Sequence, residues 1–215
     1  MPSKKDQLKV DLEMRWQILV ITKEVLKFAH YFENPETSDE RSYINRNRHL
    51  IFIKWSLWRL LIIELSKLFS DSENQKFNLI KLLRKIGPAG DFRSLKFNTD
   101  ILKAWQETGD LLQESILEIN RLRNKFYAHT ESQPFDTIET TLNFTACYEL
   151  IAFAEDIIRT LASAILKQDY IVLTPYFQSG TFDFIRILAD DERANLEQIA
   201  KDNNMTYDQL IGKDS

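Results

Sequence analysis

Hydrophobic residues recur along most of the chain with the three- and four-residue steps of an α-helix. The first stripe consists of Met14, Ile18, Ile21, Val25, Phe28 and Phe32, and it ends at Asn34-Pro35, a helix-stopping pair. Residues 35–43 are polar and are expected to form a loop. A second helix is predicted from Ile44 to Phe69. Because it is apolar on most sides, we expect it to be a buried helix in the middle of a bundle.

The same periodicity continues through the middle of the chain. A short helix is predicted over about residues 74–86, followed by the strongest break in the chain, Gly87-Pro88 and Gly90. The next helix should be capped at residues 98–100 and run to about residue 126 or 128. After a loop at residues 130–134, Asp136 and Glu139 resemble a capping pair for a last long helix.

The tail has a different pattern. Residues 170–173 and 182–188 are rich in β-branched and aromatic residues, which predicts either a small β-hairpin or, at 182–188, a short helix. A further helix is predicted at 191–202, with a turn at Asn203-Asn204 and another helical turn at 206–211. The sequence therefore predicts an all-α fold. Residues 1–166 would form an up-down bundle of four to five main helices, and residues 167–215 a C-terminal extension.

Composition narrows the class of protein. The 215 residues suit one domain, or one domain with an appendage. A protein that coats duplex nucleic acid is usually basic overall, whereas this chain has a net charge of -4. Any contact with nucleic acid must therefore be local. The one cysteine, Cys147, cannot form an internal disulfide, which favours the cytoplasm. The most apolar run, residues 50–63, is short and interrupted by Lys54 and Arg59, so we expect no membrane partner.

Most kinds of reactive site are unsupported by the sequence. There is no Cys pair and no His-x-x-x-His or Glu-x-x-His set that would hold zinc or a di-iron centre. Neither a Gly-rich phosphate loop nor a Gly-x-Ser-x-Gly nucleophile turn occurs. Cys147 lies on an apolar helix stripe and is interpreted as a core residue. We therefore expect neither a metal nor a cofactor.

One cluster of candidate residues remains, RLRNKFYAH at 121–129, at the end of a predicted helix. Arg121, Arg123 and Lys125 concentrate positive charge in an acidic chain. Arg123 can donate two N–H groups to one phosphate, and His129 titrates near neutrality. Beside them, Asn124 offers a donor and an acceptor.

These residue types suit cleavage of a phosphodiester bond in RNA. His129 would act as a general base on the ribose 2′-hydroxyl or as an acid toward the leaving 5′-oxygen. Arg123 would stabilise charge on the phosphoryl oxygens. The nucleophile comes from the RNA, so no metal is needed and the product would end in a 2′,3′-cyclic phosphate.

Two conditions accompany this hypothesis. Cations near a helix C-terminus also interact favourably with the helix dipole, and a His before a loop can simply cap carbonyl groups. A purely structural role for the cluster therefore stays open. In addition, six residues on an ideal helix turn a side chain by about 240°. Arg123 and His129 therefore share a site only if the helix ends between them or a second subunit completes it.

The segment RNKFYAHTE, residues 123–131, resembles the signature of HEPN domains, particularly their abortive-infection branch. The resemblance covers about residues 10–166 as an architecture and implies a metal-independent RNA endonuclease of phage defence or toxin–antitoxin systems. It implies Arg123 and His129 as catalytic residues with Asn124 in support, at a cleft shared by a homodimer. Glu131 stands where one HEPN toxin group carries a modified Tyr, so that form of regulation is not expected.

Further residues and partners follow from this assignment. The residues predicted to bind RNA are Arg121, Lys125 and Tyr127. Glu64 and Lys67 either face the motif in support or form a solvated or salt-bridged pair. The expected partners are RNA, a second copy of the chain, and an antitoxin or other defence-system protein.

Two other functions stay open. The first is a catalytically inactive HEPN module that binds nucleotide, RNA or a protein partner. The second is a DNA-binding regulator that uses two helices around a turn in the tail, LEQIAKDNNMTYDQLI, although the acidic residues there would repel phosphate.

Overall fold

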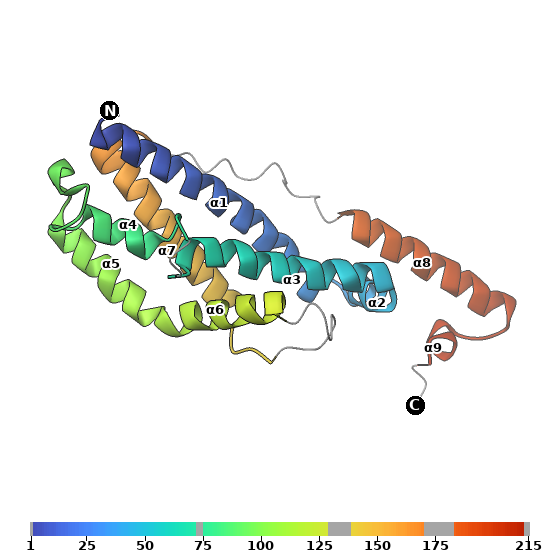
Figure 1. Cartoon of the computed structure of the whole chain (residues 1–215). Coiled ribbons are helices and arrows are strands. Elements are labelled where there is room, and N and C mark those ends of the chain that lie inside the picture. Colours follow the sequence, from blue (N-terminus) through green and yellow to red (C-terminus); the bar gives the residue numbers. More distant parts are fainter. Residues whose placement is uncertain (1, 72–74, 129–138, 170–182, 213–215) are drawn as a thin grey trace. The chain divides into compact units, whose positions relative to one another are not determined.

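The computed structural model describes residues 2–71, 75–128, 139–169 and 183–212, without the side chains of residues 126–128. Within these residues the fold is all-α and has no β-strand (Figure 1), so the predicted fold class is confirmed. The longer helices are α1 (Lys4–Glu33), α2 (Ser38–Arg46), α3 (Arg48–Phe69), α4 (Leu79–Ile86), α5 (Thr99–Leu111), α6 (Gln113–Ala128), α7 (Phe144–Leu161) and α8 (Asp183–Asp202). The shorter elements are the 3-10 helix η1 (Arg93–Leu95), the π-helical turn η2 (Ala162–Leu166) and α9 (Tyr207–Leu210).

The chain divides into two compact units. The first unit comprises residues 1–27 and 57–173, and the second comprises residues 28–56 and 174–215. The long helices α1 and α3 each contribute one end to either unit. These units group the chain differently from the expected division into residues 1–166 and 167–215, since α8 packs against α2 within the second unit. The expected domain division stays a prediction.

Helix α7 lies at the core of the first unit. Its buried side chains follow helical spacing and are Cys147, Leu150, Ile151, Phe153, Ala154, Ile157, Ile158 and Leu161. Two polar contacts hold α7 against its neighbours. Lys23 of α1 donates to Glu155 over 2.7 Å, and Trp105 of α5 donates to Asp156 over 2.6 Å.

In the second unit, helix α2 starts with a capping box. The Thr37 hydroxyl accepts from the Glu40 amide, and the Glu40 carboxylate accepts from the Thr37 amide. Glu40 is buried and also accepts a hydrogen bond from the Tyr31 hydroxyl over 3.0 Å. The expected loop at 35–43 is therefore wrong, because the capping box starts a helix at Ser38 in spite of the polar sequence.

The predicted helix from Ile44 to Phe69 is in fact two helices. Asn47 has an extended backbone, with φ -94° and ψ 109°, and it separates α2 from α3. The first half of α3 is also less buried than expected, since Phe52 is 58% exposed and Ile53 is 40% exposed. Only the second half carries fully buried residues, such as Leu61, Ile62 and Leu65. The idea of a helix buried along its whole length is therefore wrong.

Some buried positions and helix boundaries differ from the prediction. In α1, Met14 and Ile21 are exposed, and Leu12 and Leu19 are buried in their place. A turn at Leu112 divides the helix expected from residue 98 to residue 128.

The remaining boundaries concern α4, α7 and the tail. Asn78 caps α4, which starts at Leu79, and Asn143 caps α7, which starts at Phe144. Asp136 lies outside the described residues, whereas Glu139 precedes α7 in an irregular segment. In the tail the helical alternative is right, because residue 183 already belongs to α8, and the turn at Asn204 is confirmed by its φ of 55°. None of the described helices has the length and apolar character needed to cross a membrane.

Candidate functional site

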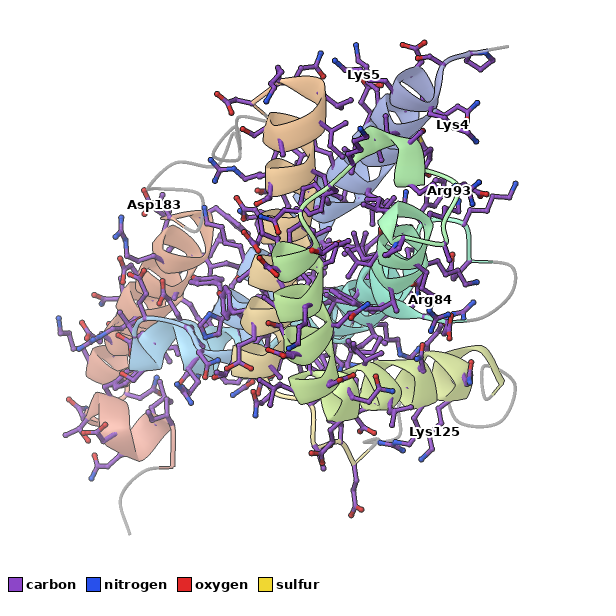
Figure 2. All side chains as sticks on the ribbon, turned by 90° about the vertical axis from the view of Figure 1, so that its left-hand side faces the viewer. Lys4, Lys5, Arg84, Arg93, Lys125 and Asp183 are labelled. Carbon is purple, nitrogen blue, oxygen red and sulfur yellow. The ribbon has the colours of Figure 1, made fainter. Side chains whose placement is uncertain are left out.

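Helix α6 carries the described part of the RLRNKFYAH cluster. Ile116, Ile119 and Leu122 are buried, so they fix which side of α6 faces the core. Arg123 is half-buried beside this apolar side, whereas Asn124 and Lys125 are exposed. Lys125 points away from the surrounding helices (Figure 2). The Tyr127 side chain and all of His129 lie outside the described residues.

Arg123 rests on the chain that leaves the end of α3. One of its guanidinium nitrogens, Nη1, lies 3.5 Å from the hydroxyl of Ser70, a buried residue directly after α3. At this length the contact is a weak hydrogen bond, but it locates the guanidinium beside the end of α3.

Ser70 is itself held by a buried amide. Asn78 is fully buried, and its Nδ2 donates to the Ser70 carbonyl over 2.7 Å. Its Oδ1 accepts from the Lys81 amide over 2.8 Å and so caps α4. One side chain thus fixes both the end of α3 and the start of α4, which sets the place where Arg123 rests.

Beneath this junction lies a fully buried guanidinium. Arg15 of α1 is 0% exposed and pairs with Asp11 over 2.7 Å. It also donates to the carbonyls of Lys76 and Asn78, over 3.1 and 3.3 Å. Burial lowers the pKa of Arg15, and the Asp11 carboxylate opposes that shift. These bonds tie α1 to the segment before α4, so Asp11, Arg15, Asn78, Ser70 and Arg123 form one connected polar frame.

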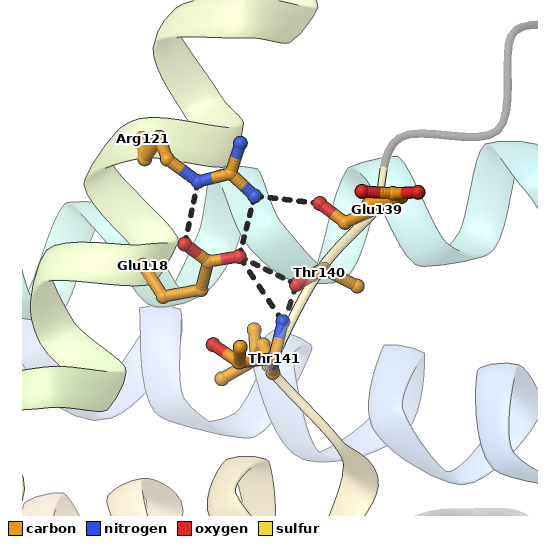
Figure 3. Close-up of polar contacts among 6 residues, drawn as sticks. Glu118, Arg121, Glu139, Thr140 and Thr141 are labelled. Atoms are coloured by element: carbon orange, nitrogen blue, oxygen red, sulfur yellow. Dashed lines mark hydrogen bonds and ion pairs between the residues drawn. The ribbon is translucent and has the colours of Figure 1, made fainter.

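Arg121 has a different role from Arg123, although the two are only two residues apart. It forms two hydrogen bonds of 2.6 Å to Glu118 and donates to the Glu139 carbonyl over 2.7 Å (Figure 3). Glu118 also accepts from the Thr140 hydroxyl over 2.8 Å and the Thr141 amide over 3.3 Å. These bonds form a clamp that fastens the chain before α7 onto α6.

The clamp depends on an ionised Glu118. The hydrogen bond from Arg121 is the largest of several contacts that lower the pKa of Glu118 to about 2. Glu118 in turn raises the pKa of Arg121. Arg121 therefore uses several of its N–H groups in bonds to Glu118 and Glu139 within the fold. Its contact with RNA stays a prediction.

Glu64 and Lys67 pair with each other on α3. Lys67 donates to Glu64 over 2.5 Å, and Glu64 is buried while Lys67 is partly exposed. The second Glu64 oxygen, Oε2, is buried and has no hydrogen-bond partner among the described residues. The ion-pair interpretation of these two residues is confirmed, whereas their support of the motif is still a prediction.

Neither metal chemistry nor cysteine chemistry is indicated in the described residues. No group of three or more His, Cys, Asp or Glu side chains there could hold a metal ion. Burial raises the pKa of the Cys147 thiol to about 12, so it would remain protonated at neutral pH. Cys147 is a core residue, as predicted.

Comparisons with protein-family models, curated proteins and solved structures found no match. The assignment of a function therefore depends on the residues and geometry of this chain alone. Two features bear on it: the position of Arg123 on the polar frame, and the continuity of α6.

Helix α6 is continuous through Ala128, so it does not end within the five residues that follow Arg123. Arg123 and His129 can therefore share a site within one chain only if the direction of the chain changes at or beyond residue 128. Otherwise a second subunit must complete the site.

Four residues of the polar frame were not singled out from the sequence: Asp11, Arg15, Ser70 and Asn78. Asn78 had a usable signal, because Asn before a run such as LIKLL is a typical helix cap. Arg15 had none, since a charged residue in an amphipathic helix is normally expected on the exposed side.

Proposed function

We propose that the protein is a metal-independent RNA endonuclease of HEPN type, in which Arg123 and His129 are catalytic and Asn124 supports them. The observation that carries the proposal is the placement of Arg123. Among the described cations of the RLRNKFYAH cluster, Arg123 alone is half-buried, and it contacts the polar frame at Ser70, which Asn78 holds. A guanidinium held in advance can stabilise developing phosphoryl charge without first being reorganised.

The proposed reaction needs only groups of the chain and of its substrate. His129 removes the proton of a ribose 2′-hydroxyl, whose oxygen attacks the adjacent phosphorus, and the 5′-oxygen leaves as it gains a proton. Arg123 stabilises the charge on the non-bridging oxygens. The products are a 2′,3′-cyclic phosphate and a free 5′-hydroxyl.

A second copy of the chain is the proposed source of the complete site. Since α6 remains helical through Ala128, Arg123 and a residue directly after the helix would point in different directions from one chain. A homodimer would bring an Arg123 from one copy toward a His129 from the other. A defence-system protein such as an antitoxin is a further proposed partner, in the cytoplasm.

The direct test is cleavage of a labelled single-stranded RNA by the purified full chain in EDTA. We expect cleavage by the wild type and a loss of at least about 100-fold in rate for Arg123→Ala and for His129→Ala. His49→Ala is the matched control, because His49 is exposed at the start of α3 and should leave the rate unchanged. An intact RNA after prolonged incubation with the dimeric wild type, or full activity in His129→Ala, would contradict the proposal.

An inactive HEPN module that binds RNA or a protein is the second candidate. The Glu118–Arg121 clamp favours it, because it neutralises one of the three cations that would concentrate charge at the motif. This candidate predicts RNA binding without cleavage, and binding that His129→Ala leaves intact.

A further inference from the structure

A strongly basic stretch of the chain lies outside the motif. Residues 75–98 contain six basic residues and one acidic residue, Asp91, and so have a net charge of +5 in a chain whose net charge is -4. We call these six residues the α4–η1 basic face: Lys76, Lys81, Arg84, Lys85, Arg93 and Lys96. Such a local concentration of charge is the expected footprint of a polyanion ligand on an otherwise acidic protein.

Helix α4 separates its apolar and basic residues onto opposite sides. Leu79, Leu82, Leu83 and Ile86 are buried, so Lys81, Arg84 and Lys85 occupy the remaining sides. The Arg84 side chain is 65% exposed, and its ion pair with Asp71 is 3.8 Å long. An exposed pair of this length contributes little, so an incoming phosphate can displace it.

A tight reversal of the chain brings η1 back to the end of α4. The Phe92 amide donates to the Lys85 carbonyl over 2.8 Å. Gly90 is required here, because a Cβ at this position would lie 2.1 Å from the Lys85 carbonyl oxygen. The reversal therefore adds the exposed cations Arg93 and Lys96 to those of α4.

The first turn of α1 extends the same surface. The Lys4 ammonium lies 5.9 Å from the ring centre of Phe92, which places it at η1. Figure 2 shows Lys4, Arg93 and Arg84 along one side of this unit, with Lys125 of α6 further along that side. The basic surface and the motif helix are thus accessible from the same direction.

The basic face also adjoins the frame of Arg123. Asn78, which caps α4, is the residue that holds Ser70, and the hydroxyl of Ser70 contacts Arg123. A strand that follows the cations of α4 toward its N-terminus therefore arrives at the junction on which Arg123 rests.

The surface is suited to a phosphate backbone rather than to a membrane. Within residues 75–98 no large apolar side chain is exposed, and Leu79, Leu82, Leu83 and Ile86 of α4, together with Phe92, are buried. A helix that binds a membrane surface normally inserts exposed apolar residues beside its cations. Arginine and lysine without such residues are typical of contacts with phosphates.

We propose that the α4–η1 basic face binds the phosphate backbone of single-stranded RNA and leads the strand to Arg123. The inference rests on the proposed function, since it takes its substrate from that reaction. It adds the location of the binding surface, which is separate from the catalytic residues and independent of His129.

The test is fluorescence anisotropy with a labelled oligouridine RNA and the full chain carrying His129→Ala, which prevents cleavage. A triple variant, Arg84→Gln, Arg93→Gln and Lys96→Gln, removes three cations while sparing the core. We expect its affinity to fall by about 10-fold or more, and the slope of log K against log salt to decrease by about 2. The control triple, Arg41→Gln, Arg186→Gln and Lys201→Gln, removes three exposed cations of the second unit and should bind almost as the parent does.

Three outcomes would overturn the inference: equal RNA binding by the parent and the basic-face triple, an equal loss in both triples, or binding to phosphatidylserine vesicles in place of RNA. Failure of the proposed function gives a different result. If the wild type never cuts RNA but the basic-face triple still loses affinity, the surface stands and the nuclease does not. If the wild type cuts RNA and the triple has an unchanged KM, the nuclease stands and the surface does not.

Discussion

Arg15 in the first unit and Arg193 in the second each lie at the centre of a polar network, and the two differ chiefly in burial. Arg15 is 0% exposed and bonds to the Asp11 carboxylate and to three backbone carbonyls. The Arg193 side chain is 50% exposed and lies between Asp39 and Glu197, over the ring of Tyr207. A buried charge must keep its partners, whereas an exposed charge can exchange them for water.

The two units therefore use polar side chains in different ways to join their helices. In the first unit the buried network connects α1 to the junction of α3 and α4, and through Ser70 to Arg123. In the second unit the ion pairs Arg193–Asp39 and Arg46–Glu192 join α2 to α8 at the surface. The candidate site is therefore connected to the rest of its unit by a few buried polar residues, whereas the ion pairs of the second unit lie at the surface.

The largest effect is expected for Arg15→Ala. It removes a buried donor from the Asp11 carboxylate and from the carbonyls of Asp11, Lys76 and Asn78, which should lower the free energy of unfolding by about 3–5 kcal/mol. Urea denaturation followed by circular dichroism measures this. The double variant Asp11→Leu with Arg15→Met removes both charges and keeps the volume, so it should recover most of the loss. A single Arg15→Ala variant as stable as the wild type would remove the distinction between the two networks.

A smaller effect is expected for Glu118→Gln, whose network is intermediate in exposure. The pKa of Glu118 falls to about 2 in the folded chain, below its ordinary value of about 4.3. The stabilisation is thus fully present above about pH 4.3 and is lost as the pH falls toward 2. Thermal unfolding should show the variant less stable at pH 7, with the difference shrinking between pH 5 and pH 3. Glu114→Gln, exposed on the same helix, is the control, and a pH-independent difference would contradict the clamp.

The smallest effect is expected for Arg193→Ala. Although Asp39 and Glu197 raise the pKa of Arg193, its ion pairs are exposed and screened by salt. The thermal midpoint should change by no more than the error of the measurement, at both low and high salt. A loss comparable to that of Arg15→Ala would show that the exposed network is structurally as important as the buried one.

The sequence predicted the fold class and most helices, because apolar spacing in α1, α4 and α7 is strong. It missed the start of α2, although Thr37 and Glu40 form a legible capping box, since the surrounding residues are polar. The break at Asn47 was hidden by apolar residues on both sides, Ile44 and Leu50, which fit one continuous helix. Exposure of Phe52 was not predictable, because composition cannot tell a covered apolar side from an open one.

The candidate site was predictable as a motif but not as a geometry. The spacing of Arg121 and Arg123 gives no reason to expect a clamp for one and a buried frame for the other. That difference depends on Glu139, Thr140 and Ser70, which are distant in sequence. The basic run from Lys76 to Lys96 was legible in the sequence, but only the reversal at Gly90 shows that η1 returns to the end of α4.

The central claim is that the RNA supplies the nucleophile while Arg123 and His129 supply catalysis. The most direct measurement uses an RNA oligonucleotide with a mapped cleavage site and a matched copy with a single 2′-deoxynucleotide at that site, both incubated with the wild-type chain in EDTA. We predict that the first is cut to a 2′,3′-cyclic phosphate end and that the second stays intact at that position. Equal cleavage of the two, or an end that carries a 3′-hydroxyl, would contradict the account.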